Sequence, residues 1–341
     1  MDKMRMEHLE SQQTTTPARQ CQPIAVTRQS LPRILNMRGP SQQVGKLEFG
    51  TGGLPIGIHS VDGNLVFESG LPWLAGGHCE ILASGGTVEA CMGGVLLRGE
   101  DSLAGVLIAE EGNDFTESAR WLYERLFSLL GDLRLFRIWN FVPWINQKID
   151  GLENYHAFNA GRHQAMQKAW GNSLTGKLPA ASALGTYSGP LSLAFVAGKA
   201  PVRYFENPLQ IPALEYPAQY GKLPPAFARG SIVNEPNGNT WHLSGTASIR
   251  GSETCGADFR TQLQLTLENI ATVCSHMEIP ASRRAGWKIF LRDPSNLAAS
   301  QAAMQRAYPQ DAASMIFLQA DICREDLQVE VEGIFHQPKP L

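Results

Sequence analysis

The sequence predicts an α+β fold of two tandem halves, each a sheet with helices packed on one face. The chain has 341 residues, 43% of them apolar, which suits about two domains or one large domain with a sizeable core. The order strand, helix, strand, helix, strand occurs twice, over about residues 104–196 and 240–335. A sheet covered by its own helices would bury the apolar faces of the elements in each half.

The first half begins with a buried strand over residues 104–109. Asp114 then caps a helix, Glu117 completes a capping-box pattern three residues later, and Gly131 ends the helix. The elements that follow are a strand over 133–142, a helix over about 152–170 and a strand near 191–196.

The second half repeats this order of elements without repeating the sequence. Asp258 caps a helix that runs to about Met277, and Asp293-Pro294 ends the strand that precedes the next helix. The other elements are strands over 240–249 and 287–291, an Ala-rich helix over about 296–308, and strands over 314–322 and 327–335.

The last of these strands carries two acidic residues. Val329 and Val331 alternate with Glu330 and Glu332, so both carboxylates lie on the same face of the strand. The residues alone leave two interpretations open. The acids belong to the solvated face of an edge strand, or they point together into a site.

Three segments are predicted along the chain. Residues 1–45 are polar and predict a mobile N-terminal arm, residues 46–200 form the first half, and residues 201–341 form a connector and the second half. The connector, residues 201–233, is rich in Pro and Tyr and has neither a helical nor a strand period. Its aromatic residues favour an ordered segment with a function.

Composition argues against several classes of function. The formal net charge of -3, with 29 Lys and Arg against 32 Asp and Glu, argues against a dedicated nucleic-acid binder. The N-terminus has no apolar signal region, and no stretch approaches the ~20 apolar residues of a membrane span. We therefore expect a cytoplasmic protein with neither nucleic-acid nor membrane partners.

Motifs for metals and cofactors are also missing. None of the 6 cysteines forms a C-x-x-C pair, so we expect free thiols and no metal site. The glycines of Gly50-x-Gly52-Gly53 neither follow a clear strand nor open a helix, and there is no phosphate-binding loop and no serine nucleophile elbow. We expect an enzyme that uses no cofactor.

Five segments, taken together in their order and spacing, resemble the chorismatase family. The segments are WNFVPWIN at 139–146, NYHAFNAGR at 154–162, the stretch 206–229 with ENPLQ, YPAQYG and FAR, SGTAS at 244–248, and the stretch 320–332 with ADICR and VEVE. The resemblance covers roughly residues 45 to 337. It implies two tandem YjgF-like (reactive-intermediate-deaminase-like) halves, each with a mixed sheet, which agrees with the doubled order of elements.

The resemblance also implies a reaction. Chorismatases cleave chorismate to pyruvate and a ring carboxylic acid without a metal or organic cofactor. Chorismate has two carboxylates, for which fixed Arg and Tyr donors are suited. The family motifs place this recognition on six residues: Tyr155, Arg162, Tyr216, Gln219, Tyr220 and Arg229. They place the general acid on Glu330, whose pKa must be raised by burial or by a neighbour such as Glu332 so that it can protonate the enolpyruvyl methylene.

Two further residues bear on the ring product. Cys323 lies where benzoate-forming members of the family carry cysteine, which favours 3-hydroxybenzoate, alone or with 4-hydroxybenzoate. Ala247 lies where hydrolytic members carry alanine, which favours a trans-dihydroxycyclohexadiene carboxylate. We give Cys323 more weight because a thiol can take part in proton movement, whereas a methyl group only changes the volume of the pocket.

Other functions stay open at this stage. One is an imine or enamine deaminase, like smaller proteins of the same fold, and another is a non-catalytic module that binds an aromatic acid. A doubled chain could complete its own site as a monomer, and the sequence leaves a small homo-oligomer open.

Overall fold

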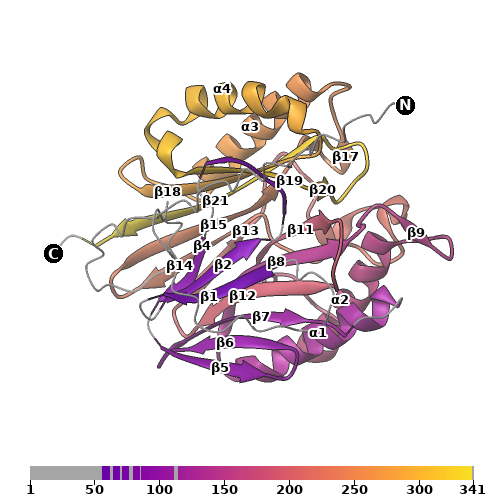
Figure 1. Ribbon diagram of the computed structural model, residues 1–341, viewed down its shortest axis with the longest axis vertical. Coiled ribbons are helices and arrows are strands. Elements are labelled where there is room, and N and C mark those ends of the chain that lie inside the picture. Colours follow the sequence, from indigo (N-terminus) through magenta and orange to yellow (C-terminus); the bar gives the residue numbers. More distant parts are fainter. Residues whose placement is uncertain are drawn as a thin grey trace, which may run out of the picture.

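The computed structural model describes residues 56–339, apart from residues 62–63, 70, 77–79, 85 and 111–113. In it, two seven-stranded sheets lie face to face, and each is covered on its outer face by two helices (Figure 1). The arm predicted over residues 1–45 lies outside the described residues. None of the helices in the described part is long and apolar enough to cross a membrane.

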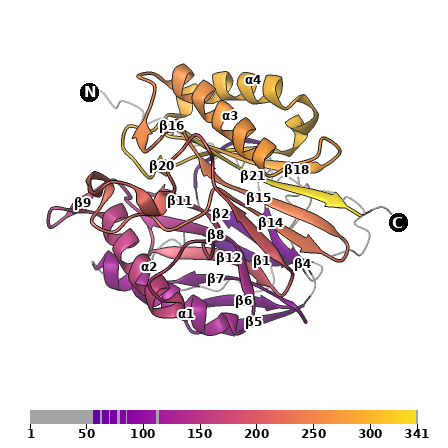
Figure 2. The ribbon, with the colours of Figure 1, turned by 180° about the vertical axis from the view of Figure 1, so that it is seen from behind.

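The first sheet has the strand order β20-β11-β8-β12-β7-β6-β5. Only β8 and β11, which the chain connects through helix α2, pair in parallel. Helices α1 and α2 cover the outer face of this sheet (Figure 2). The elements are β5 (Thr87–Cys91), β6 (Gly94–Arg98), β7 (Ser102–Ile108), α1 (Phe115–Leu130), β8 (Arg134–Pro143), α2 (Asn154–Trp170), β11 (Ala180–Thr186), β12 (Ser192–Gly198) and β20 (Asp321–Ile322).

The second sheet has the order β3-β19-β18-β21-β15-β14-β13, and β18 and β19 are its parallel pair. The two sheets therefore match strand for strand, with the parallel pair in the same place. The elements are β3 (Trp73–Gly76), β13 (Val202–Phe205), β14 (Gly230–Glu235), β15 (Gly238–Thr246), α3 (Phe259–His276), β18 (Arg284–Leu291), α4 (Leu297–Ala307), β19 (Met315–Gln319) and β21 (Val329–Pro338).

Shorter elements surround the two sheets. A three-stranded sheet of β1 (Ile56–Val61), β2 (Asn64–Ser69) and β4 (Glu80–Ser84) precedes strand β5 of the first seven-stranded sheet in the chain. Two hairpins, β9 (Lys148–Ile149) with β10 (Leu152–Glu153) and β16 (Ile249–Arg250) with β17 (Glu253–Thr254), extend from the loops. The 3-10 helices are Ala213–Glu215, Ala218–Tyr220, Pro294–Asn296 and Pro309–Ser314.

The predicted helices and their ends are confirmed, with one difference in a cap. The Asp114 carboxylate accepts hydrogen bonds from the Thr116 and Glu117 backbone N–H groups, at 3.0 and 3.1 Å. Gly131 follows α1 with a φ of 58°. The Glu117 side chain, however, accepts a hydrogen bond from Arg120 one turn on, at 3.3 Å between Arg120 Nε and Glu117 Oε1, where the capping-box pattern predicts a bond back to the cap.

One prediction about strands is wrong, and one of the two interpretations left open for the acidic strand is excluded. The connector over 201–233 lacks a strand period, yet β13 begins it and β14 ends it, and these two strands pair with each other. The interpretation of Glu330 and Glu332 as the solvated face of an edge strand also fails. Strand β21 is the fourth of seven, between β15 and β18, and both glutamates are buried.

The two halves exchange their outermost strands. Strand β3 precedes the first sheet in the chain but pairs with β19 of the second, and β20 lies between strands of the second sheet in the chain but pairs with β11 of the first. The division near residue 200 stays a prediction, and these two strands cross it. Each sheet is therefore completed by a strand from the other side of that boundary.

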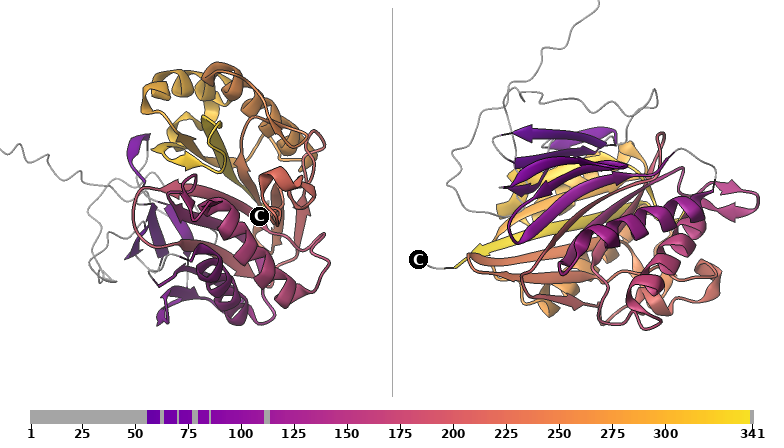
Figure 3. Two further views of the ribbon diagram at one scale, coloured as in Figure 1. Left: turned by 90° about the vertical axis from the view of Figure 1, so that its right-hand side faces the viewer. Right: turned by 90° about the horizontal axis from the view of Figure 1, so that it is seen from below.

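Two further views show how the two sheets are stacked on each other (Figure 3). The layer between the two sheets is apolar in one part and polar in another. Its apolar part includes Phe141 and Leu184 of the first sheet and Phe290 and Leu318 of the second. Its polar part consists of buried residues that stand on facing strands: Arg137, Ser182, His242, Lys288, Glu330 and Glu332. Buried charge on this scale is costly unless it is paired, so this part of the layer is where we look for function.

Candidate active site

A cavity of about 210 Å³ lies where the connector and α2 meet β11 and β21. All nine residues predicted for the site line it, although they come from positions 155 to 330. They are Tyr155, Arg162, Tyr216, Gln219, Tyr220, Arg229, Ala247, Cys323 and Glu330. The structure thus brings the predicted residues together, while the role of each stays a prediction.

Glu330 lies on β21 and lines this cavity, with 4% of its surface exposed. Its carboxyl group rests on the main chain of Gly245 in β15. A Cβ atom at position 245 would meet Glu330 Oε1 at 1.9 Å. The register between β15 and β21 shifts between Leu243 and Thr246, which brings this bare stretch of main chain beneath the acid. A side chain at position 245 would therefore displace the Glu330 carboxyl group from this position.

Burial and a neighbouring carboxylate hold Glu330 in its acid form. Removal from water raises the pKa of Glu330 to about 8, Glu332 adds to the rise, and Arg137 and Arg229 oppose it. No hydrogen-bond donor contacts the Glu330 carboxyl among the residues that the structure describes. The side chain is thus a protonated, unshared acid at neutral pH, as general-acid chemistry requires.

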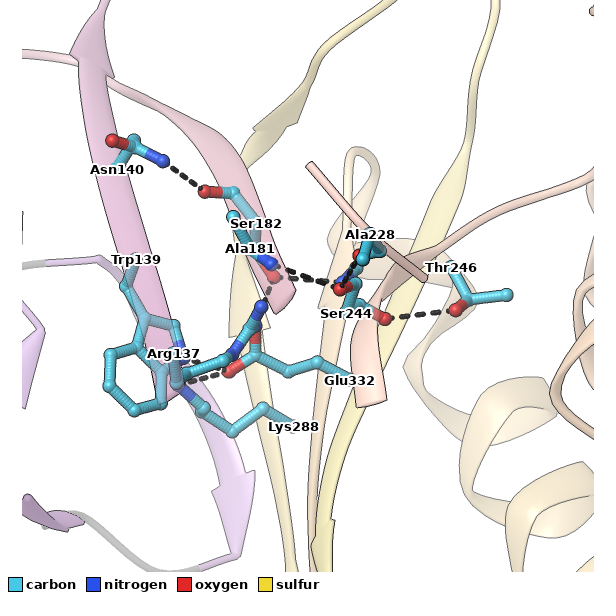
Figure 4. A network of polar contacts seen from close by, with 11 residues as sticks. Arg137, Trp139, Asn140, Ala181, Ser182, Ala228, Ser244, Thr246, Lys288 and Glu332 are labelled. Carbon is cyan, nitrogen blue, oxygen red and sulfur yellow. Dashed lines mark hydrogen bonds and ion pairs between the residues drawn. The ribbon is translucent and has the colours of Figure 1, made fainter. Parts of the chain in front are cut away.

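Glu332, two residues further along β21, is held in the opposite state. It forms ion pairs with Arg137 of β8 and Lys288 of β18, and the Arg137 Nη2 atom lies 2.7 Å from Glu332 Oε2. Trp139 Nε1 donates to Glu332 Oε1 at 2.8 Å, and Ser182 Oγ donates to Oε2 at 2.5 Å (Figure 4). Burial alone would raise the pKa of Glu332, but Lys288 and Arg137 lower it, so this carboxylate stays ionised.

Two buried arginines line the cavity and bring positive charge to it. Arg162 of α2 donates to Asn159 Oδ1 at 2.7 Å, and its Nε has no partner among the described residues. Arg229 donates to the Tyr216 hydroxyl at 2.7 Å, while its Nε is 3.9 Å from Glu206 Oε2, beyond hydrogen-bonding distance. Buried donors without partners are suited to an anionic ligand.

Phenols and an amide form another wall of the cavity. The Tyr220 hydroxyl donates to Glu253 Oε2 at 2.6 Å, and Gln219 Nε2 donates to Glu253 Oε1 at 3.1 Å. Burial raises the pKa of Tyr155 well above its usual range, so its hydroxyl stays a neutral donor. Tyr216 accepts its bond from Arg229 and keeps its own proton available to donate.

The two residues that bear on the ring product lie together beside the acid. Cys323 packs against the small cluster that contains Ala247, Ile249, Ile322 and Leu327. Burial raises the pKa of Cys323 to about 12, with Glu330 adding to the rise, so the side chain is a neutral thiol. Both product-related side chains thus line the same cavity as Glu330.

Several residues of the site were missed from the sequence. Arg324 lines the cavity, its guanidinium carbon lies 3.7 Å from the centre of the Tyr220 ring, and its buried Nη2 has no partner among the described residues. It follows Cys323 in the ADICR segment, so its charge was a usable signal. Arg137, Ser182 and Lys288 gave no local signal, because each is a polar residue inside an apolar strand.

The side chains around the cavity provide cations, phenols, a thiol and an acid. In the described part of the chain, His, Cys, Asp and Glu side chains form no group of three or more that could hold a metal ion. The cavity offers three arginines, three phenols, a thiol and one protonated carboxyl group. This set can bind an anion with more than one carboxylate and donate a proton to it.

Comparisons with known proteins agree with these features. A family model described as the N-terminal part of FkbO/Hyg5-like chorismatases matches residues 82–197. The chain is 32% identical over 239 residues to a "3-hydroxybenzoate synthase" of Streptomyces hygroscopicus, which is 64% of this chain and 69% of that protein. It is 33% identical over 250 residues to a "Chorismatase" of the same organism, which is 68% of this chain and 71% of that protein.

A solved structure gives the same answer for the fold. A crystal structure of a chorismatase superposes with a TM-score of 0.72 and 25% sequence identity, over 92% of this chain and 99% of that one. The predicted α+β fold of two tandem halves, each a mixed sheet with helices on one face, is confirmed by this match and by the matching strand orders. With two relatives above 30% identity that it covers by more than two thirds, the chain belongs to the chorismatase family.

Proposed function

We propose that this protein cleaves chorismate to pyruvate and 3-hydroxybenzoate, with Glu330 as the general acid. The observation that carries the proposal is the buried, protonated Glu330 in a cavity that is also lined by arginines. The names of the relatives, a chorismatase and a 3-hydroxybenzoate synthase, support the same substrate and product. The reaction balances without water, because the atoms of chorismate equal those of the two products.

Recognition of the two substrate carboxylates is assigned to the cations of the cavity. Arg162 and Arg229 are buried, and each has a donor atom without a hydrogen-bond partner among the residues that the structure describes. Arg324 adds a third guanidinium, stacked on Tyr220, with one buried nitrogen also lacking a partner. Guanidinium groups bind carboxylates through paired N–H donors, so the dianion would satisfy the unpartnered nitrogens.

The chemical step begins with proton transfer from Glu330 to the methylene carbon of the enolpyruvyl ether. The ether carbon becomes an oxocarbenium ion, which makes pyruvate a good leaving group. The neighbouring ring hydroxyl oxygen then displaces pyruvate and closes an epoxide. Opening of the epoxide and loss of a ring proton give the aromatic 3-hydroxybenzoate. Glu330 receives a proton back from the reacting groups and is ready for another turnover.

A second product has an observation in its favour. Ala247 lines the cavity beside Cys323, and its methyl group matches the residue expected in hydrolytic members. In that reaction a water molecule attacks the oxocarbenium carbon, and a trans-dihydroxycyclohexadiene carboxylate leaves with pyruvate. A mixture of 3- and 4-hydroxybenzoate is the third outcome that the same assay distinguishes.

The proposal is tested by incubating the purified protein with chorismate, with and without EDTA. We expect pyruvate in equal yield in both samples, measured by coupling to lactate dehydrogenase. Chromatography of the same samples against authentic ring acids identifies the second product. Absence of pyruvate above a no-enzyme blank would overturn the substrate, and a dihydrodiol as the main ring acid would overturn the assigned product while leaving the substrate in place.

A further inference from the structure

Four side chains and one backbone amide meet at a single point between the two sheets. We call Arg137, Ser182, Lys288 and Glu332 the inter-sheet cluster. All four are buried, with exposed fractions of 5% or less. Arg137 and Ser182 come from the first half, and Lys288 and Glu332 come from the second, as Figure 4 shows. The proposed reaction uses none of the four directly.

Ser182 is the junction of this cluster. Its Oγ donates to Glu332 Oε2 at 2.5 Å and accepts a hydrogen bond from the Gly245 backbone N–H at 2.9 Å. Arg137 Nη2 also donates a hydrogen bond to Ser182 Oγ. The hydroxyl group therefore links the Glu332 carboxylate to the stretch of main chain on which Glu330 lies.

The backbone around Ser182 is fixed in turn. Asn140 Nδ2 donates to the Ser182 carbonyl at 2.9 Å, and the Tyr123 hydroxyl donates to Asn140 Oδ1 at 2.7 Å. The neighbouring Ala181 N–H donates to Ser244 Oγ at 3.0 Å, which ties β11 to β15. A hydroxyl held from this many directions has one orientation, and it transmits that orientation to its partners.

We propose that Ser182 and Arg137 are positioning residues for Glu330, and that they act by fixing the Glu332 carboxylate and the Gly245 main chain beneath it. The inference rests on the proposed role of Glu330 as the acid. It assigns a task to the first half of the chain, which supplies none of the buried acids of the described residues. Ser182 and Arg137 act through Glu332 and Gly245, so they are not catalytic residues.

The physical consequence is electrostatic as well as steric. Glu332 is an anion fixed two residues from Glu330, and it disfavours a second charge there, whereas Arg137 favours one. The two groups therefore act on the acid with opposite signs. The other titratable and charged groups that face Glu330 or the cluster come from several elements: Arg229 ahead of β14, His242 of β15, Lys288 of β18, Cys323 after β20, and Tyr155 and Arg162 of α2.

The sign of each variant follows from this arrangement. In Glu332→Gln the anion is lost, so the pKa of Glu330 falls and the rate declines at lower pH than in the wild type. In Arg137→Met the cation is lost, so the same pKa rises and the rate persists to higher pH. Ser182→Ala should lower kcat about tenfold with little change in KM, because the acid loses its fixed position without losing its charge environment.

The measurement is a pH profile of kcat for each variant, with titration of the Glu330 carboxyl by ¹³C NMR. Glutamate labelled at the side-chain carboxyl carbon reports all glutamates, and Glu330→Gln identifies the signal of Glu330. The NMR titration needs no substrate, so it tests the cluster even if chorismate is not turned over. Opposite shifts in Glu332→Gln and Arg137→Met are expected, and equal or absent shifts would refute the inference.

Two controls keep the result interpretable. Ser300→Ala removes another fully buried serine hydroxyl, on α4, and should leave kcat unchanged. If Glu332→Gln alone does not fold, the double variant Lys288→Met with Glu332→Gln removes one cation with the anion and relieves the charge imbalance. Loss of kcat in Ser182→Ala and Ser300→Ala alike would show that a buried hydroxyl matters only for stability.

Discussion

Strands β12 and β21 occupy the same place in the two sheets and carry opposite chemistry. Each lies fourth of seven, and the inward side chains of both are buried between the sheets. On β12 these side chains are Ala194 and Val196, and on β21 they are Glu330 and Glu332. The two sheets thus share one strand arrangement, but only the central strand of the second sheet carries inward-facing acids.

The strands beside them explain how the second copy tolerates those acids. Arg137 of β8 pairs with Val196 of β12, and Lys288 of β18 pairs with Glu332 of β21. A cation therefore stands next to the central strand in each sheet, and both cations converge on Glu332. A buried carboxylate is strongly destabilising without such partners. The first half supplies one counter-charge, Arg137, and the second half supplies the other, Lys288, together with both acids.

Among the variants that test this comparison, replacement of Glu330 should have the largest effect on the rate. We expect Glu330→Gln to lower kcat by about 10³-fold, within the range of a lost general acid. Glu110→Gln, an exposed acid far along the chain, is the matched control and should retain full rate. Retention of more than a tenth of the wild-type rate by Glu330→Gln would assign the proton transfer to another group.

The same variant has a pH-dependent effect on stability. The folded-state pKa of Glu330 is about 8, above the unfolded value. The unfolded chain therefore loses this proton first, and wild-type stability declines as the pH rises from the unfolded pKa to 8. Because Glu330→Gln has no proton to lose, it should be more stable than wild type at pH 8 by on the order of 2–4 kcal/mol, and equal to it near pH 4. Urea unfolding at the two pH values measures this difference.

A methyl group at Gly245 should have the next largest effect. The new Cβ would displace the Glu330 carboxyl, which lies where that atom must go. We expect Gly245→Ala to lower kcat about 100-fold and the free energy of unfolding by about 1–3 kcal/mol. Gly176→Ala, at a glycine with φ of 74° and nothing within 4 Å, carries only backbone strain and is the control. Equal kcat in both variants would contradict the role of the close contact between Glu330 and Gly245.

Changes at the product-related residues should alter the ratio of ring acids more than the rate. Cys323→Ala removes the thiol beside Glu330, and we expect a larger share of the dihydrodiol acid. Ala247→Gly removes a methyl group from the same cluster, and we expect a larger share of 3-hydroxybenzoate. Chromatography of the ring acids measures both, with Cys274→Ala, a buried thiol of the other core, as control. An unchanged product ratio in Cys323→Ala would remove the thiol from the mechanism.

The sequence predicts the helices and strands of this fold better than it predicts which of them lie next to one another. Asp114, Asp258 and the alternation of β21 are local signals, and the helix caps and acid strand they indicate are present. Strand β11 was missed because six of the seven residues of its sequence, AASALGT, are neither β-branched nor aromatic. Ser182 was missed with it.

The site divides in the same way. The nine predicted residues could be named from the sequence because whole segments resemble a known family. All nine line one cavity. The partners of Glu332 could not be found so, because Arg137 lies 195 positions away and is a lone charge in the apolar strand RLFRIWNFVP. Burial of a charge is favourable only with its partner, and the partner is fixed by how the two sheets face each other. That information is tertiary and has no local pattern.

The smallest expected effect concerns β12 and tests whether its inward face is passive. Val196→Ala removes apolar volume from the layer between the sheets, on the strand that corresponds to β21, and should cost about 1–2 kcal/mol of stability. The rate should stay within about twofold of wild type, because Val196 pairs with Arg137 through the backbone while the Arg137 side chain is held by Glu332 and Ser182. Urea unfolding and the pyruvate assay measure the two quantities. A large loss of rate with little loss of stability would show that the first half shapes the acid site through packing on β12 as well as through Arg137 and Ser182.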